Sequence, residues 1–417
     1  FIFITLLIIV PTVILSFNIF QSQRYIYKSL SKEFQIIIRT VRKAENIKKG
    51  LSNLVEAVLN DYNVKYLPET QFINLELKKK KINFDEKKGK YFSFYIETIG
   101  SKIWLIDHLG SVFQIDIDDI KNKKSKNLNT EIIANNLTTN KVVGTLVHNN
   151  NLYIASKKIV NNCVNLNISV AKINSEYLEF KNFFKPTECA IGAFGGGRMQ
   201  FFIHENAEGL IISTSDWLPG DKYDERPQDN KSIFGKVLFI DFNEKNHIIF
   251  SKGHRNSIGL YSKDNLILST DHGPRGGDEI NKVIYKKNYG WPEASYGEIY
   301  GHHNKEKLTE PIYLKSHEKY GFQEPVFSFV PSIGISQIIN IPNNFSKFWS
   351  DNFLVSSLFG RSLYRVKFDK HYNKVIYYEK IFIGERIRDL KYLYDDNIIL
   401  LALEDEGELG VIKILND

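Results

Sequence analysis

The segment at residues 271–281 holds the densest group of side chains that could take part in chemistry. It reads Asp-His-Gly-Pro-Arg-Gly-Gly-Asp-Glu-Ile-Asn and follows directly on a short apolar run. Glycine and proline favour a tight turn whose carbonyl groups can point at one spot, and hard cations such as calcium prefer six to eight oxygen ligands. The turn could therefore hold a cation, although a Gly-Pro turn by itself is more often only a turn.

Three arginines outside this turn could bind an anion. Arg255 lies in the sequence Gly-His-Arg-Asn at residues 253–256, and Arg386 and Arg388 are two residues apart, so that on a strand they share one face. Guanidinium groups that converge on one site suit a ligand with several carboxylates. Taken singly, each arginine is more often a surface ion-pair residue. A rigid aromatic turn, Asn-Tyr-Gly-Trp-Pro, occupies residues 288–292.

The elements that must position these residues read as β-strands. From about residue 90 the helical period disappears, and short apolar runs alternate with turns rich in Asn, Asp and Gly. A unit of strand, polar turn and strand starts near residues 92, 142, 199, 257, 335 and 389. Its spacing of about 50 to 60 residues matches one four-stranded propeller blade, and about 325 residues are too many for one β-sandwich. The pattern predicts a β-propeller.

The first 20 residues carry no charge and are mostly apolar. As a helix they would span about 30 Å, which is enough to cross the hydrocarbon core of a bilayer. A cleaved signal peptide is the alternative, but its apolar stretch is usually shorter and ends in a small-residue cleavage site, which does not follow here. We therefore expect a transmembrane anchor at residues 1–20.

The next segment, residues 21–65, has a different composition. Between residues 21 and 50 the chain carries eight basic and two acidic residues, a net charge of 8 − 2 = +6. Because these bases lie beside the apolar segment and not over the whole chain, they favour contact with anionic lipid headgroups, and we expect no nucleic-acid partner. Apolar residues at alternating steps of three and four predict a helix against the membrane or the main domain, with a dimeric coiled coil as the less favoured alternative.

The expected organisation is thus an anchor at 1–20, a basic juxtamembrane helical segment at 21–65 and a propeller at 66–417. The positive-inside tendency would keep the basic side cytoplasmic, whereas a long domain can translocate regardless of charge, so charge alone leaves the side open. Our expectation is a propeller on the periplasmic or otherwise extracytoplasmic side. The only two cysteines, Cys163 and Cys189, could pair in an oxidising compartment, and two buried free thiols are an equal alternative.

Composition and missing motifs exclude several classes of protein. The chain has 417 residues, 43% of them hydrophobic and 25% charged, which excludes disorder and a collagen-like or disulfide-rich scaffold. It contains no nucleotide-binding glycine loop, zinc-binding spacing or Gly-x-Ser-x-Gly elbow. Enzymes that depend on those motifs are set aside.

The motifs at residues 253–256, 271–281, 288–292 and 386–389 together resemble the soluble quinoprotein glucose/sorbosone dehydrogenases, also called aldose sugar dehydrogenases. The resemblance is strong from about residue 190 onward, faint between 90 and 190 and does not cover residues 1–65. It implies a six-bladed β-propeller that holds pyrroloquinoline quinone (PQQ) and calcium at the mouth of its central channel and oxidises an aldose at its anomeric carbon. By this resemblance the quinone would be contacted by Arg255, Asn256, Arg386 and Arg388, and calcium by the carbonyls of Gly273 and Pro274.

One departure from the family pattern concerns the catalytic base. Family members carry a histidine four residues before the arginine of a Gly-Gly-Arg turn, whereas here the turn ends at Arg198 and the position holds Phe194. A base that removes the hydroxyl proton contributes roughly 10²–10⁴ in rate, and phenylalanine cannot replace it. The family's cofactor-binding lysine aligns with Phe359, with Arg361 close by. No catalytic residue is therefore assigned.

Two functions follow from these residues. The first is a membrane-anchored PQQ-dependent sugar dehydrogenase that transfers a hydride from sugar C1 to a calcium-bound quinone and passes electrons to a separate acceptor, with activity reduced by Phe194. The second is a non-catalytic propeller that binds a sugar, a quinone or a protein ligand.

Overall fold

The structure is a computed structural model, and it describes eight stretches of the chain. The expected segments at residues 1–20 and 21–65 lie outside them, and so does Phe194. Among the described residues, no helix is long and apolar enough to cross a membrane. The described stretches are residues 70–84, 91–121, 127–161, 163–174, 176–190, 195–216, 225–298 and 313–415.

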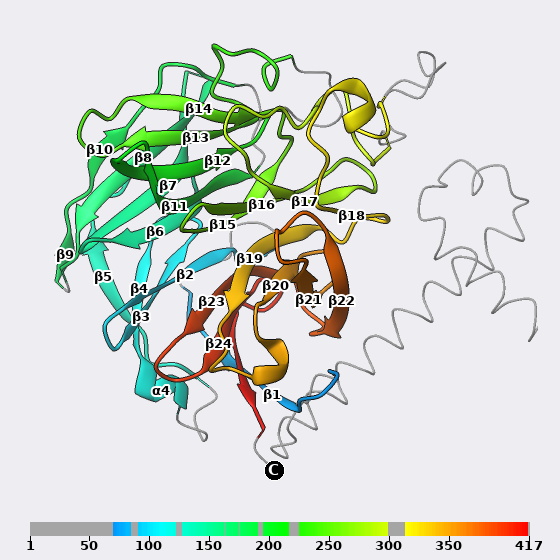
Figure 1. Cartoon of the computed structure of the whole chain (residues 1–417). Helices are drawn as coiled ribbons and strands as arrows, with labels where there is room; N and C mark the ends of the chain where they lie inside the picture. The colour runs from blue at the N-terminus through cyan, green and yellow to red at the C-terminus, as the bar shows by residue number, and fades with distance from the viewer. Residues whose placement is uncertain are drawn as a thin grey trace, which may run out of the picture. The chain divides into compact units, whose positions relative to one another are not determined.

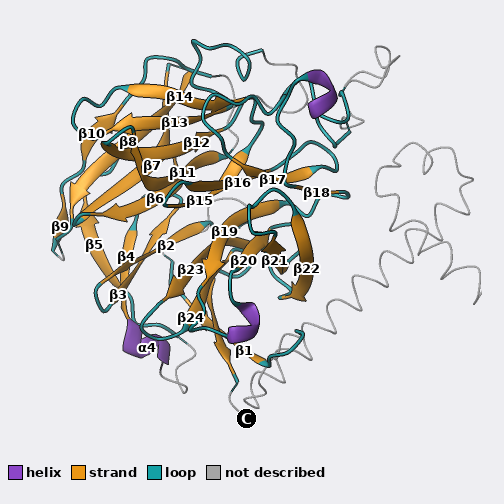
Figure 2. Ribbon diagram, viewed as in Figure 1, coloured by secondary structure: helices purple, strands orange, loops and turns teal. Residues whose placement is uncertain are grey.

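Six sheets follow one another along the described chain, and each forms one blade of a propeller (Figures 1 and 2). We number the blades in chain order. Blade 1 contains β2 (Phe94–Ile99), β3 (Lys102–Asp107), β4 (Val112–Asp116) and β5 (Glu131–Asn135), with the short β9 (Tyr177–Leu178) parallel to β5. Blade 2 contains β6 (Lys141–His148), β7 (Asn151–Val160), β8 (Cys163–Lys172) and β10 (Lys181–Phe184). Blade 3 contains β11 (Gly196–His204), β12 (Ala207–Thr214), β13 (Lys236–Asp241) and β14 (His247–Lys252).

The other three blades complete the ring. Blade 4 contains β15 (Ser257–Lys263), β16 (Leu266–Asp271), β17 (Asp278–Lys282) and β18 (Phe327–Phe329). Blade 5 contains β19 (Ile335–Ile341), β20 (Asn352–Ser357), β21 (Ser362–Phe368) and β22 (Val375–Phe382). Blade 6 contains β23 (Ile387–Leu393), β24 (Ile398–Leu403), β25 (Glu408–Ile414) and β1 (Leu75–Lys81). Short helical turns are α4 (Ile117–Lys121), η2 (Glu318–Tyr320) and η3 (Lys347–Trp349).

The strand that comes first in the chain closes the ring. β1 pairs antiparallel with β25, from Leu75 opposite Ile414 to Lys81 opposite Glu408. The innermost strands β2, β6, β11, β15, β19 and β23 contact one another in that order, and β23 also contacts β2. A closed ring leaves the inner strands without free edges, which is how propellers avoid edge-to-edge pairing. The all-β, six-bladed propeller that the sequence predicts is confirmed.

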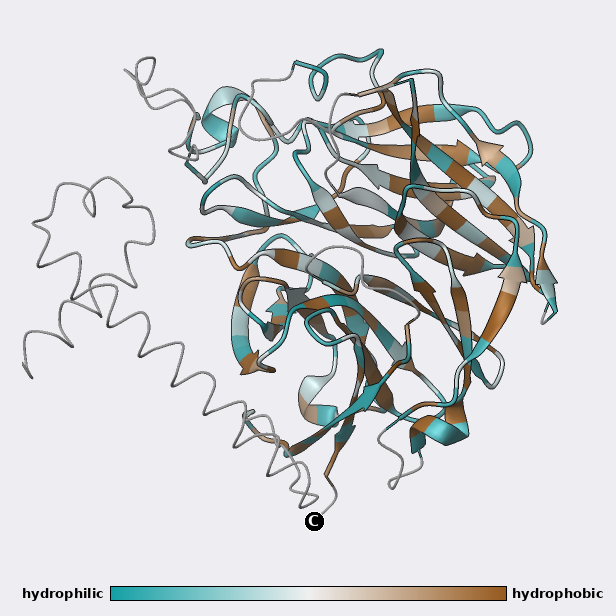
Figure 3. Cartoon of the chain, turned by 180° about the vertical axis from the view of Figure 1, so that it is seen from behind, coloured by the Kyte–Doolittle hydropathy of each residue, from teal (hydrophilic) through white to brown (hydrophobic). Residues whose placement is uncertain are grey.

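Apolar side chains fill the interface between each pair of consecutive blades of the described chain. Met199 of blade 3 packs beside Leu146 of blade 2, for example, and Leu401 of blade 6 lies in one cluster with Leu354 of blade 5. Strands in the middle of a blade, such as β20 and β24, are buried along their whole length, whereas the outermost β22 alternates. Figure 3 shows hydrophobic residues along the strands within the ring.

Two kinds of connection lie at the same end of the ring. Because the four strands of a blade run up and down, the start of each innermost strand and the link between the second and third strands lie at one end, which we call the site face. Residues 253–256 precede β15, residues 272–277 link β16 to β17, and Arg386 precedes β23. The topology therefore brings the candidate motifs to one face.

A disulfide joins Cys163, the first residue of β8, to Cys189, with Cα atoms 5.5 Å apart. The neighbouring residues Val164 and Ala190 exchange two backbone hydrogen bonds of 3.0 Å each. Of the two alternatives that the sequence leaves open, the structure has the disulfide.

Candidate functional site

The carboxylate of Asp271, at the end of β16, fixes the backbone that precedes β15. Its Oδ2 accepts a hydrogen bond from the backbone N of Arg255 at 3.1 Å, and its Oδ1 accepts one from the backbone N of Asn256 at 2.6 Å. Asp271 is buried, and hydrogen bonds to a buried carboxylate are strong. This contact therefore sets the directions in which the side chains of Arg255 and Asn256 leave the backbone.

Arg255 lies against the Gly-Pro turn. Its Nη1 donates to the carbonyl oxygen of His272 at 2.7 Å and to that of Gly273 at 2.9 Å. The guanidinium carbon also lies 5.3 Å from the ring centroid of Trp291, whose Nε1 donates to Asp216 Oδ2 at 3.1 Å. The aromatic turn at 288–292 thus holds Arg255, and Arg255 in turn holds the carbonyls of the Gly-Pro turn.

Asp278, the first residue of β17, holds the C-terminal end of the Gly-Pro turn in place. Its Oδ1 accepts a hydrogen bond from the Gly273 backbone N at 3.2 Å, and its Oδ2 accepts one from the Ile335 backbone N, at the start of β19, at 2.9 Å. A side chain at position 273 would not fit, since a Cβ there would lie 2.0 Å from the Gly277 carbonyl oxygen. The carbonyl of Pro274 accepts a hydrogen bond of 3.4 Å from Ser332 Oγ. The turn is therefore tied to blades 4 and 5.

Arg386 and Arg388 share one carboxylate on the site face. Glu404, which follows β24, accepts a hydrogen bond from Arg386 Nε at 3.2 Å and one from Arg388 Nε at 2.5 Å. Burial by itself would raise the pKa of Glu404, but the charge of Arg388 and the hydrogen bonds from Arg388 and Ser93 outweigh it and lower the pKa. Glu404 stays ionised, so it neutralises part of the charge of the two arginines.

His272 lies within the electrostatic reach of both arginine groups. Burial lowers the pKa of its imidazole, and the charges of Arg255 and Arg388 lower it further, whereas the carboxylates of Asp278 and Asp271 oppose them. The side chain is still 29% exposed, so a ligand can reach it. Arg255 directly precedes the innermost strand of blade 4 and Arg388 lies at the start of the innermost strand of blade 6, so the topology puts both at the site-face mouth of the channel.

Polar contacts between blades continue along the channel below this mouth. Glu97 of β2 accepts a hydrogen bond from Thr145 Oγ1 at 2.8 Å and forms an ion pair of 2.7 Å with Lys391 Nζ. Gln200 Nε2 donates to the Leu260 carbonyl at 3.2 Å. These contacts join the innermost strands of neighbouring blades and support the residues at the mouth.

The structure places most of the residues predicted from the sequence at the site face. Arg255, Gly273 and Pro274 lie on one side of the mouth with Asn256 beside them, and Arg386 and Arg388 lie together on Glu404. Phe194 lies outside the described residues. Phe359 is in the link between β20 and β21 and is 67% exposed. Arg361, in the same link, forms an ion pair of 2.8 Å with Asp405.

Sequence reasoning missed the acidic residues that orient these groups. Each of four buried acids lies at or just after the end of the second strand of its blade, on the site face. Three of them accept hydrogen bonds from the site-face links or from arginines, and the fourth accepts one from Trp291 Nε1 of the aromatic turn. Two of them directly end an apolar run in the sequence, and the other two follow such a run after two or three serine and threonine residues. These acids are Asp107, Asp216, Asp271 and Glu404.

Residues 144–411, more than half of the chain, match the family model described as Glucose / Sorbosone dehydrogenase. The aldose sugar dehydrogenase YliI of Escherichia coli is 28% identical over 248 residues, which are 56% of this chain and 64% of that protein. An uncharacterized protein of Synechocystis sp. is 26% identical over 225 residues, which are 48% of this chain and 52% of that protein. The match spans less than two thirds of the length of either relative.

Solved structures with the same fold include two aldose sugar dehydrogenases. The soluble enzyme of Escherichia coli in its apo-form superposes with a TM-score of 0.64 at 17% identity, covering 83% of this chain and 100% of that chain. The PQQ-bound form from Streptomyces coelicolor gives a TM-score of 0.57 at 14% identity, covering 84% and 100%. At these identities the likeness shows the fold alone. The extent of the family match decides the assignment: this chain belongs to the glucose/sorbosone dehydrogenase family.

Proposed function

We propose that the mouth of the channel binds PQQ and that the chain is a PQQ-dependent dehydrogenase of aldose sugars, with low activity because position 194 holds phenylalanine. The observation that carries this proposal is the 2.9 Å hydrogen bond from Arg255 Nη1 to the carbonyl of Gly273. It places a buried guanidinium directly beside the carbonyl groups of the Gly-Pro turn. Membership of the family, and a relative named as an aldose sugar dehydrogenase, support a sugar as the substrate.

Two buried polar atoms support the binding of an anionic quinone beside Arg255. Within the described residues, the Nε of Arg255 and the Oδ1 of Asn256 are buried without a hydrogen-bond partner. An unpaired buried donor or acceptor costs about 1–3 kcal/mol, so a ligand that satisfies both atoms gains affinity. In the proposal, Arg386 and Arg388 contact the same ligand from blade 6.

Calcium, held by the carbonyls of Gly273 and Pro274, is the second part of the proposal. The described residues contain no group of three or more His, Cys, Asp or Glu that could hold a metal, so carbonyl oxygens would have to supply the protein ligands. The Gly273 carbonyl already accepts a hydrogen bond from Arg255 Nη1, and the positive charge of this guanidinium would repel a calcium ion at the same oxygen unless an anion lies beside them. We therefore expect calcium to bind together with the quinone and not before it.

The chain contributes mainly position and charge to the proposed reaction. PQQ supplies the hydride-accepting quinone when it is bound. Asp271 fixes the backbone that carries Arg255, and Glu404 fixes the guanidinium groups on the other side of the mouth, so that little reorganisation is needed when an anion enters. Burial lowers the pKa of His272 and keeps its imidazole neutral near pH 7, so this side chain adds no positive charge to the mouth.

A non-catalytic propeller that binds a sugar, a quinone or a protein ligand is the second candidate. The observation in its favour is the phenylalanine at position 194. In both versions we propose that residues 1–20 anchor the chain in a membrane and that the propeller is extracytoplasmic. The disulfide between Cys163 and Cys189 supports this location, since disulfides persist in oxidising compartments.

The experiment is a calorimetric titration of the full chain with PQQ, with and without calcium, followed by dye reduction in the presence of aldoses. Calcium-dependent binding with dye reduction supports the dehydrogenase. Saturable binding without dye reduction supports the non-catalytic propeller. No binding of the quinone under either condition overturns the proposal that the mouth is a quinone site.

A further inference from the structure

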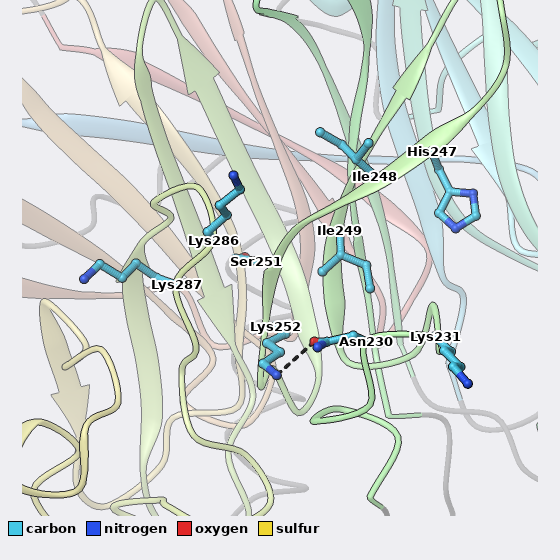
Figure 4. A pocket seen from close by; sticks show the side chains of 9 residues that line it. All are labelled: Asn230, Lys231, His247, Ile248, Ile249, Ser251, Lys252, Lys286 and Lys287. Carbon is cyan, nitrogen blue, oxygen red and sulfur yellow. Dashed lines mark hydrogen bonds between the residues drawn. The ribbon is translucent and has the colours of Figure 1, made fainter.

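A basic cleft lies on the outer side of the propeller, where blades 3 and 4 meet (Figure 4). Its volume is about 430 Å³. One wall is β14, the outermost strand of blade 3, and the other is the turn at 286–287 that follows β17 of blade 4. Residues 230–231, from the link between β12 and β13, complete it. We call it the lysine cleft.

Four lysines and one histidine line the lysine cleft, and no acidic residue lines it. Lys252 has a structural role, because its Nζ donates to the Gln228 carbonyl at 3.0 Å and to Asn230 Oδ1 at 2.9 Å. The ammonium groups of Lys231, Lys286 and Lys287 differ from it. In the part of the chain that the structure describes, none of these three forms an ion pair with a carboxylate, and all three side chains are exposed. The Nζ of Lys286 lies 4.8 Å from the ring centroid of Tyr285, and a cation–π contact at an exposed site contributes only about 0.5–1 kcal/mol, so a phosphate can replace it.

The lysine cleft also has an apolar wall. Ile248 and Ile249 of β14 line it, and Ile248 is 38% exposed. In Figure 4 the isoleucines lie between Lys286 and Lys287 on one side and His247 and Lys231 on the other. A ligand that fits this arrangement carries negative charge for the ammonium groups and an apolar part for the isoleucines.

The positive charges of Lys231, Lys286 and Lys287 are not explained by a need to keep other strands from pairing with the edge of β14. Lysines placed on edge strands prevent association with other strands, and β14 is the outermost strand of its sheet. Part of its outer edge is already covered, because the Phe250 carbonyl accepts a hydrogen bond from the Lys286 backbone N at 2.7 Å and the Lys252 backbone N donates to the Lys287 carbonyl at 3.1 Å. Of the cleft lysines, however, only Lys252 is part of β14, and its ammonium group is turned to Gln228 and Asn230. Lys231, Lys286 and Lys287 lie on two separate links, and it is the backbone of residues 286–287 that covers this edge, so the charges of their side chains are not needed for it.

We propose that the lysine cleft binds a phosphate-bearing anion, either free in solution or as the headgroup of an anionic lipid. Ammonium groups bind phosphate as compact point charges, and several of them around one cleft raise the local concentration of an anion. The isoleucine wall receives the apolar part of the molecule that carries the phosphate. This site is separate from the channel mouth and does not depend on quinone binding.

The test is calorimetry of the full chain with two probes. Inorganic pyrophosphate represents the free anion, and dihexanoyl phosphatidylglycerol below its micelle concentration represents the lipid, with dihexanoyl phosphatidylcholine as the zwitterionic control. We expect saturable binding of one of the anionic probes at low ionic strength, weakened by added salt. The variant Ile248→Ser should weaken binding of the lipid and leave pyrophosphate binding unchanged, which identifies the source of the phosphate.

A triple variant and a matched control locate the binding. Lys231→Gln/Lys286→Gln/Lys287→Gln should weaken binding about a hundredfold, since each lysine near an anionic surface contributes about fivefold. The control Lys367→Gln/Lys370→Gln/Lys380→Gln changes three exposed lysines of blade 5, and its affinity should stay within about twofold of that of the unmodified chain.

In the unmodified chain, the bound probe should also slow acetylation of Lys231, Lys286 and Lys287, read by mass spectrometry. Equal losses in the two triple variants, no protection of these lysines, or no saturable binding of either anionic probe overturns the proposal.

Discussion

Arg198 Nη1 lies 2.8 Å from Asp389 Oδ1, and the two residues belong to the innermost strands of blades 3 and 6. In a closed ring of six blades these are opposite blades, so the ion pair crosses the axis of the channel. Arg198 also donates to the carbonyl of Ile258 in blade 4 at 3.1 Å, and Asp389 Oδ2 accepts from the backbone N of Ile96 in blade 1 at 2.9 Å. Four blades therefore meet at one buried pair.

This pair also positions Arg388 at the mouth. Arg198 Nη2 donates to the Arg388 carbonyl at 2.9 Å, and Ser336 Oγ donates to the same oxygen at 2.8 Å. Arg198 reaches the axis because Gly197 precedes it with a φ of +91°, and a Cβ at Gly197 would lie 2.4 Å from Val143 Cγ2. Only glycine fits at position 197 with this backbone conformation. The Gly-Gly-Arg turn can therefore place the Arg198 guanidinium in the channel.

Removing one partner of this pair should destabilise the propeller strongly. Arg198→Met leaves the buried carboxylate of Asp389 without its cation, which typically costs about 3–5 kcal/mol. The double variant Arg198→Met/Asp389→Asn should recover a large part of that loss, because asparagine can still accept from the Ile96 backbone N. Urea denaturation of the two variants and of Arg275→Met, which changes an exposed arginine, measures the effect. A double variant less stable than Arg198→Met would contradict this account.

The blades could be predicted from the sequence because the repeated unit is local. Each unit is two apolar runs joined by a polar turn. The runs at 335–339 and 353–357, for example, nearly coincide with β19 and β20. β9 could not be predicted in this way, since its two residues pair with β5, which is more than 40 positions earlier in the chain. β1 was missed because Leu75–Lys81 contains four lysines and reads as a polar segment.

Only those parts of the site that lie within one continuous stretch of sequence could be predicted. Asp271 and Gly273 lie in one motif with conspicuous glycines, so their neighbourhood was visible in the sequence. Glu404 is 16 residues beyond Arg388 and ends a run of apolar residues, and nothing local says that it turns back to bind the arginine. The pairing of Arg198 with Asp389 depends on ring closure, because it joins residues 191 positions apart that only the closed ring brings together.

Arg255 should dominate quinone binding if the channel mouth is the cofactor site. Arg255→Gln removes the guanidinium that contacts Gly273 and the unpaired Nε beside it. Since a hydrogen bond to a charged group is worth about 1.5–3 kcal/mol, PQQ affinity should fall roughly 10- to 100-fold in calorimetry. Arg275→Gln is the matched control, because Arg275 lies in the link that Arg255 contacts but is exposed. Equal affinities of the two variants would place the quinone elsewhere.

Phe194→His should restore a general base if the chain is a weakened dehydrogenase. An imidazole that takes the sugar's hydroxyl proton is expected to raise kcat by roughly 10²–10⁴ with little change in KM, because phenylalanine can bind but cannot accept a proton. Dye reduction with aldoses in the presence of PQQ and calcium measures this. Phe194→Leu serves as the control and should show no gain. If the histidine variant binds the quinone and still shows no turnover, the non-catalytic propeller is the better description.

Glu279 of β17 gives the fold a pH dependence that can be measured without any cofactor. Burial raises the pKa of its carboxyl well above the ordinary value, and the charges of Asp271, Asp278 and Glu324 raise it further. Between the unfolded pKa of about 4.3 and the higher folded one, the native state binds the extra proton, so this contribution to stability is present at low pH and is lost as the pH rises. Glu279→Gln should therefore be more stable than the unmodified chain at pH 8 in urea denaturation, and the difference should shrink toward pH 4. Glu318→Gln, at an exposed site, should follow the unmodified chain throughout, and a difference that grows toward low pH for Glu279→Gln would reverse the assigned direction.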